Sequence, residues 1–160
     1  MEENMITYDE LYEQIHRITE MSNVLRYLFR ERSMCDTESC CDLFYKYMDL
    51  VQEHIYMVDR DMYSELLKSP DEKINNVAKN FMSGSVEVKK ILRQFTKQWC
   101  ATTDKHTLKI KAHEQFLRDT DKLFDLVLQR ILNETEHLYP LVRNLGRREK
   151  APTFEQGVMA

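Results

Sequence analysis

Apolar side chains recur every three or four residues along four long stretches of this chain, and this spacing limits the fold more than any other feature. In the first stretch they are Leu11, Ile15, Ile18, Leu25 and Phe29. This is the period of an amphipathic α-helix with one buried face. The 160 residues include only three glycines and three prolines, which leaves few positions for the tight turns of a sheet. The sequence therefore predicts an almost entirely helical protein.

Local signals set the ends of the predicted helices. Thr7, with Glu10 three residues later, forms a capping box, and Ser69 followed by Pro70 is typical of a helix start. Pro140 predicts a kink near the end of the last helix. The predicted helices are 7–33, 37–68, 69–99 and a fourth from about His106 or Lys111 to Asn144, ended by Gly146.

The connections between these long amphipathic helices are short, which favours an all-α, up-down-up-down four-helix bundle. A chain of this length forms one domain, which we place at residues 1–146. Residues 147–160 show no helical period, and we expect them to be a mobile C-terminal tail. The sequence leaves the oligomeric state open.

The charge and the hydropathy of the chain limit its partners and its compartment. A formal net charge of −4 argues against nucleic acid as a partner. No apolar run approaches the ~20 residues of a membrane span, and the acidic N-terminus lacks the apolar core of a signal peptide. We therefore expect a cytoplasmic protein with neither a nucleic-acid nor a membrane partner. A protein partner stays open.

A charged pair interrupts the apolar seam of the fourth helix. Arg130 and Glu134 stand between Val127 and Leu138, where valine or leucine would be expected. Because they are four residues apart, they share one helix face and can pair. A buried pair of this kind is costly unless its hydrogen bonds are met. The pair therefore predicts a site, or the remains of one, inside the bundle.

The other three helices bring polar or small residues to a similar depth. His16 lies at the edge of the first seam, His54 lies within the second, and Gly84 is at the centre of the third. His16 is also compatible with a boundary position, and His54 with a core histidine that has one partner. Gly84 either lets another helix approach closely or leaves space. We expect these residues to form one central layer with Arg130 and Glu134.

The second and fourth helices also resemble each other at an offset of 76 residues. The second reads H-IYM-V-D-RD-MYS from His54, and the fourth reads R-ILN-E-T-EH-LYP from Arg130. In this arrangement the chain resembles the hemerythrin-like (HHE cation-binding) family. The resemblance implies a four-helix bundle around a non-haem di-iron centre of five histidines and two bridging carboxylates, used to carry or sense oxygen. His16, His54 and Glu134 match the ligand pattern of that family.

Other positions depart from the pattern. Val58 stands where the resemblance implies a carboxylate, with Asp59 one residue later, and Arg130 stands where it implies a histidine. Phe81 and Ser85 lie where the third helix would carry its histidines. An arginine next to the metals would repel them, and it cannot lose its proton.

We therefore favour a hemerythrin-like protein in which a buried polar network of His16, His54, Arg130 and Glu134 replaces the di-iron site. It would be a non-enzymatic binding or regulatory protein of sensor type, with no cofactor favoured, because no nucleophile–base pair can be read from the spacing. The alternative is a protein that binds non-haem iron or another metal through His16, His54 and Glu134. Such a protein would sense or carry oxygen, nitric oxide or redox state, and Arg130 would have to turn away.

A second cluster is predicted at one end of the bundle, where the topology gathers the four cysteines. These are Cys35, Cys40, Cys41 and Cys100, with His106 near them. The helix dipole should lower the pKa of Cys40 or Cys41 near the start of the second helix. The cluster could be a thiol redox switch, which is our second alternative function, a metal site, or apolar packing.

Overall fold

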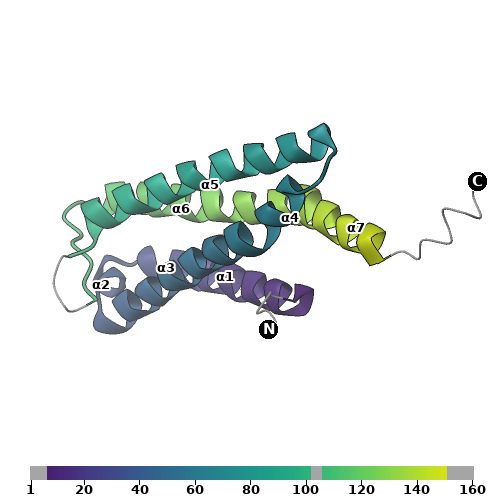
Figure 1. The fold of residues 1–160 in the computed structure, drawn as a ribbon. Helices are drawn as coiled ribbons and strands as arrows, with labels where there is room; N and C mark the ends of the chain where they lie inside the picture. Colours follow the sequence, from purple (N-terminus) through teal and green to yellow (C-terminus); the bar gives the residue numbers. More distant parts are fainter. Residues whose placement is uncertain (1–6, 102–105, 151–160) are drawn as a thin grey trace, which may run out of the picture.

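The computed structural model describes residues 7–101 and 106–150, and side chains up to residue 145 (Figure 1). This part of the chain is helical apart from its connections, as predicted, with an isolated β-bridge between Cys100 and Leu108. The elements are α1 (Tyr8–Phe29), α2 (Arg32–Cys35), α3 (Glu38–Val58), the π-helical segment η1 (Asp59–Tyr63), α4 (Ser64–Leu67), α5 (Glu72–Trp99), α6 (His113–Asn133), the π-helical segment η2 (Glu134–Leu138) and α7 (Tyr139–Lys150).

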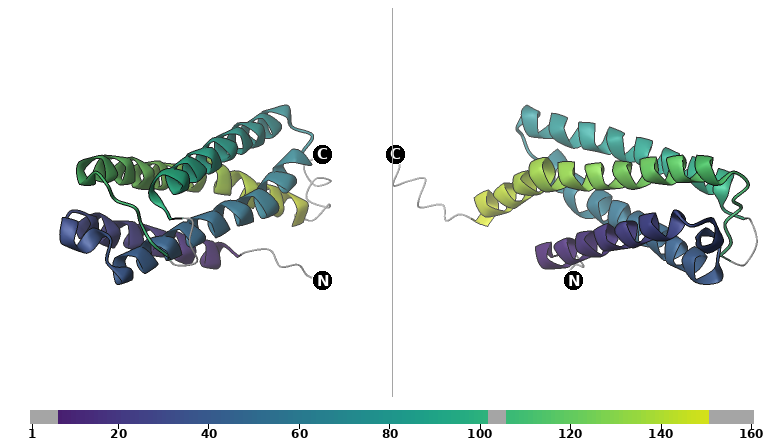
Figure 2. Two further views of the ribbon diagram at one scale, coloured as in Figure 1. Left: turned by 90° about the vertical axis from the view of Figure 1, so that its left-hand side faces the viewer. Right: turned by 180° about the vertical axis from the view of Figure 1, so that it is seen from behind.

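The long helices pack side by side as an all-helical bundle. Helix α1 lies against α3 and α6, while α5 lies against α6, α4 and η1 (Figures 1 and 2). The beginning of α1 and the end of α7 lie at the same end of the bundle. Tyr8 and Arg143 join them there, with the guanidinium 4.7 Å from the ring centroid. In the described part of the chain, no helix has the length and apolar character that a membrane span needs.

The start of α1 is as predicted, because the capping box of Thr7 and Glu10 is present. The start of the third long helix differs from the prediction. Helix α5 begins at Glu72 with Asp71 as its N-cap, since the Asp71 carboxylate accepts from the backbone N–H of Lys73 at 2.9 Å. Ser69 instead accepts from the N–H of Asp71 at 3.1 Å. A carboxylate suits the positive end of the helix dipole, so the acidic residue caps.

The last helix begins later than predicted, at His113 rather than near His106 or Lys111. The segment before it runs back beside the end of α5, because Lys109 donates its N–H to the carbonyl of Trp99 at 2.7 Å. Leu108 and Ile110 are buried in this segment. Their alternation is the pattern of an extended chain with one covered face, so the helix cannot start there.

Two helix ends also differ from the prediction. The first helix ends at Phe29, four residues early, and the short helix α2 follows it. Helix α7 runs through Gly146 to Lys150, so the predicted helix end at Gly146 is wrong, and residues 147–150 of the predicted tail are helical. Residues 151–160 of that tail lie outside the described residues. The bend predicted at Pro140 lies just before it, at η2, between α6 and α7 (Figure 1).

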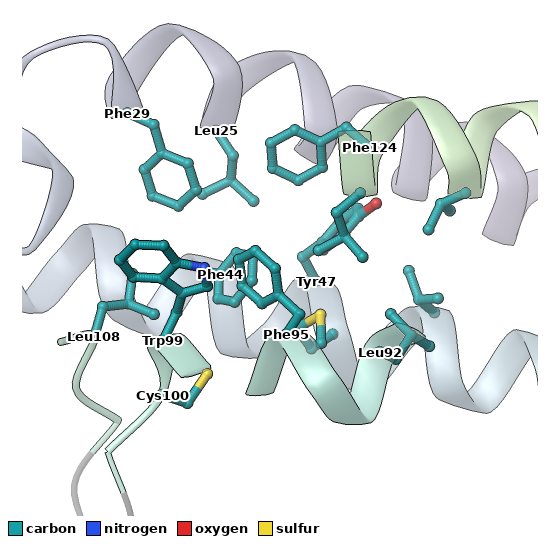
Figure 3. Packing of buried hydrophobic residues seen from close by; sticks show 14 of the residues in the cluster. Leu25, Phe29, Phe44, Tyr47, Leu92, Phe95, Trp99, Cys100, Leu108 and Phe124 are labelled. Carbon is teal, nitrogen blue, oxygen red and sulfur yellow. The ribbon is translucent and has the colours of Figure 1, made fainter. Parts of the chain in front are cut away.

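The hydrophobic core has two parts. One lies toward α2 and is rich in aromatic rings, with Phe29, Phe44, Trp99 and Phe124 among them (Figure 3). The other lies toward α4 and α7. On α3, Val51 belongs to the first cluster and Val58 to the second, so His54 lies between them. Gln14 on α1 and Glu134 at the start of η2 lie between the two clusters in the same way, and these three buried polar residues form the layer that we call the polar layer.

Tyr47 generates a prediction about stability. Its side chain is fully buried in the aromatic cluster, and its hydroxyl has no hydrogen-bond partner within the described part of the chain (Figure 3). A buried hydroxyl without a partner costs about 1–3 kcal/mol. Tyr47→Phe should therefore leave the free energy of unfolding unchanged or raise it by about 1 kcal/mol, as measured by urea denaturation.

The matched control is Tyr139→Phe, because the Tyr139 hydroxyl donates to Glu134 Oε1 at 3.0 Å. This variant should lose about 1–3 kcal/mol, since a buried carboxylate oxygen loses a donor. Equal losses in the two variants would contradict the contrast between a hydroxyl with a partner and one without.

Candidate functional site

The polar layer is built around the Glu134 carboxylate, which is 1% exposed and opens the π-helical segment η2. Its Oε1 accepts from the Tyr139 hydroxyl at 3.0 Å and lies 2.7 Å from His54 Nε2. Its Oε2 accepts from Arg130 Nε at 3.1 Å. Each oxygen of the carboxylate therefore has a hydrogen-bond donor within the protein. These hydrogen bonds offset the free-energy cost of burying the negative charge.

Arg130 connects α6 to η1 and to the neighbouring helix α5. Its Nη2 donates to the Tyr63 hydroxyl at 2.5 Å and to the backbone carbonyl of Phe81 at 2.8 Å. The guanidinium lies 5.1 Å from the centroid of the Phe81 ring, a cation–π distance. The side chain is 13% exposed. It thus lies at the edge of the core, with its cation held by an ion pair, a hydroxyl, a carbonyl and a ring.

Gly84 provides the space that the guanidinium occupies. A Cβ added at Gly84 would lie 2.6 Å from Arg130 Nη1, closer than real Cβ contacts come. Of the two roles that the sequence left open for this glycine, the structure supports space for a neighbouring side chain. The glycine on α5 and the arginine on α6 therefore depend on each other.

His54 connects the Glu134 carboxylate to helix α1. Its Nε2 faces the carboxylate, which only accepts, so this nitrogen carries a proton. Its Nδ1 lies 2.8 Å from the amide oxygen of Gln14. The ring either donates from both nitrogens, as an imidazolium, or accepts at Nδ1 from a Gln14 amide turned to present its NH₂ group. In both arrangements each ring nitrogen has a partner.

The prediction that His16 belongs to this layer is wrong. Its side chain is 69% exposed and pairs with Glu20 on the same helix, at 3.3 Å. The inward position belongs to Gln14, which is 8% exposed. Two residues turn an α-helix by about 200°, so His16 points away from the face that Gln14 buries. The spacing from Leu11 to Gln14 to Ile18 could have identified the glutamine, since it is three and then four residues.

Asp59, the carboxylate that comes one residue later than the family pattern, faces helix α5 instead. It accepts from the Ser85 hydroxyl at 3.1 Å and from Lys89 Nζ at 2.6 Å. Val58, at the position where the resemblance implies a carboxylate, is 1% exposed and packs in the core. Asp59 and Glu134 therefore open the two π-helical segments but serve separate polar clusters.

The metal set proposed from the sequence is not assembled. His54 and Glu134 meet, while His16 lies on the outer face of α1. Across residues 7–101 and 106–150, no group of three or more histidine, cysteine or acidic side chains is placed to hold a metal ion. The groups that surround Glu134 are instead hydrogen-bond donors, one of them a permanent cation.

The four cysteines are free thiols, each at most 4% exposed, in the aromatic part of the core. Burial raises the pKa of each thiol, and for Cys40, which also lies near Cys41, it raises the pKa to about 12. The predicted lowering by the helix dipole is therefore wrong, because desolvation of the thiolate outweighs the dipole. His106 is not among the thiols: it stacks on Tyr45 at 4.5 Å and faces Asp42.

Comparisons with protein-family models, with curated proteins and with solved structures give no match to this chain.

The contact between Gly84 and Arg130 predicts an energetic coupling. Gly84→Ala should gain up to about 1 kcal/mol of helix propensity in an Arg130→Ala background, where the space is free. In the wild-type background this gain should vanish or reverse, because the methyl group displaces the guanidinium from Phe81 and Tyr63. Urea unfolding of the four proteins measures the coupling. A Gly84→Ala effect of the same size in both backgrounds would show that the two residues do not share this space.

The raised thiol pKa values predict slow chemistry in the folded state. At pH 9.0, the ordinary pKa of a free thiol, Cys40 should stay protonated, so a disulfide reagent should modify the native protein slowly. In denaturant the same reagent should modify all four thiols at once. Rapid native labelling that is absent from a Cys40→Ser/Cys41→Ser variant would instead support a thiol switch.

The raised pKa of Cys40 also predicts how the free energy of unfolding depends on pH. Because this pKa is higher in the folded chain, the thiol's contribution to stability is present below pH 9.0 and falls as pH rises toward about 12.

Proposed function

We propose that this chain is a hemerythrin-like, up-down-up-down bundle in which a buried polar network has replaced the di-iron centre. It acts as a non-enzymatic binding or regulatory protein of sensor type. The observation that carries the proposal is the Glu134 carboxylate, held between Arg130 and His54 at the depth where the resemblance implies metal ligands. The family assignment rests on the sequence resemblance, and the network is its physical support.

Arg130 supplies what a metal would otherwise supply to Glu134, namely a positive charge. Guanidinium offers several N–H groups in one plane, and it uses them here on a carboxylate, a hydroxyl and a carbonyl. Glu134, the ligand carboxylate that the resemblance implies, thus has a permanent cation in place of an exchangeable one. A site of this kind has no need of a metal to be stable.

The network also gives the protein a means of communication between its helices. Gln14 comes from α1, His54 from α3, Phe81 from α5, and Arg130 and Glu134 from α6 and η2. A ligand or partner that moves one helix must therefore strain or break hydrogen bonds made by the others. This coupling is the basis for proposing a regulatory rather than a catalytic role.

The first test is elemental analysis with a visible spectrum, on protein made in iron-supplemented medium and purified without chelator. We expect no stoichiometric iron and no absorption from an oxo-bridged centre, because Arg130 occupies the cationic position. Two irons per chain with that absorption would overturn the proposal and point to a working di-iron centre. One metal per chain, lost in His54→Ala and kept in Cys40→Ser, would favour the alternative of a metal-binding sensor or carrier.

A further inference from the structure

A groove of about 270 Å³ lies between α3 and α5, outside the polar layer. Neither His54 nor Glu134 takes part in it. Six residues line it, three from each helix: Gln52, Ile55, Tyr56, Lys89, Leu92 and Arg93.

The groove exists because α3 and α5 diverge. The two helices lie close together beside α4 and are farther apart toward the other end of the bundle (Figure 1). At the narrow end Asp59 joins them through its bonds to Ser85 and Lys89. At the wide end the segment before α6 is tied to α3, since Tyr45 donates to the carbonyl of Thr107 at 2.9 Å. Between these two contacts the described residues that line the groove all come from α3 and α5.

The chemistry of the lining is asymmetric. Ile55 and Leu92 are 6% and 2% exposed, and they form an apolar floor. The α3 side adds the neutral side chains of Gln52 and Tyr56, and Tyr56 as a residue is 61% exposed. The α5 side adds two cations on one helix face, Lys89 and Arg93.

The two cations are not equally available. Lys89 Nζ lies 2.6 Å from the Asp59 carboxylate, so its charge is already shared. Arg93 is exposed, and it forms no ion pair with any residue among those that the structure describes. An anion in the groove would therefore meet a free guanidinium beside an apolar surface.

We propose that this groove binds a small amphipathic carboxylate, with its apolar body on Ile55 and Leu92 and its carboxylate on Arg93. Guanidinium binds a carboxylate through two parallel hydrogen bonds, which gives direction as well as charge complementarity. The Gln52 amide offers a further donor on the opposite side. The volume lies just below the range of about 300–1,000 Å³ that is usual for ligand pockets, so the ligand is small.

The test is a titration of the full chain with octanoate below its micelle concentration, followed by amide chemical shifts in NMR spectra. We expect saturable binding, with shifts along α3 and α5 around the lining residues. Octanol and octylamine, which have the same apolar body, should bind about tenfold more weakly because they lack the negative charge. Equal binding of octanol would overturn the role of Arg93, and no saturation with octanoate would overturn the site.

Two matched variants separate the groove from general surface charge. Arg93→Gln should weaken octanoate binding about fivefold to tenfold. Lys79→Gln removes the same charge from an exposed position on α5, about four turns earlier, and should leave binding unchanged. Equal effects of the two variants would mean nonspecific attraction. Sedimentation of wild type and Tyr56→Ala completes the test: a dimer that the variant breaks would show that a second copy of the chain occupies the groove, against the proposal.

Discussion

The burial of one carboxylate organises the centre of this molecule. Glu134 lies where water cannot reach it, and an ionised carboxylate in such a place costs several kcal/mol unless donors surround it. His54, Arg130 and Tyr139 provide these donors. Each donor in turn needs its own partner, which brings Gln14 inward on α1 and requires a glycine at position 84 on α5. One buried charge thus constrains residues in all the long helices.

The polar layer also gives the bundle a defined register. Apolar seams alone specify the position of one helix along another less strictly, since the hydrophobic effect is non-directional. A shift of one turn here would separate Glu134 from His54 and leave a buried charge without its donors. The aromatic part of the core has a polar contact of this kind at its edge, where Trp99 Nε1 donates to Asp119 at 2.9 Å. Its four cysteines fill space as small apolar side chains, which explains their raised pKa values.

The sequence was sufficient for the long helices and for His54, Arg130 and Glu134 in the central layer. Periodicity alone located the long helices, and the charged pair in an apolar seam identified Arg130 and Glu134. His16 was misplaced because a histidine was preferred over the seam position of Gln14, two residues away, and helical phase decides burial. The start of α6 and the partners of Gly84 could not be predicted, because they depend on Leu108, Ile110 and Arg130 packing against distant segments.

The π-helical segment η2 brings together two residues that an α-helix would keep apart. Tyr139 donates its backbone N–H to the carbonyl of Glu134, five residues earlier, and its hydroxyl reaches the side chain of the same glutamate. In an α-helix, residues five apart point in directions about 140° different. The extra residue in this turn therefore acts as an insertion that rotates α7 against α6. The buried faces of α6 and α7 are therefore offset from each other by one residue. A single-residue deletion in 134–138 would rotate all of α7 by about 100° about its axis. It would also take the Tyr139 hydroxyl away from Glu134 at the centre of the bundle.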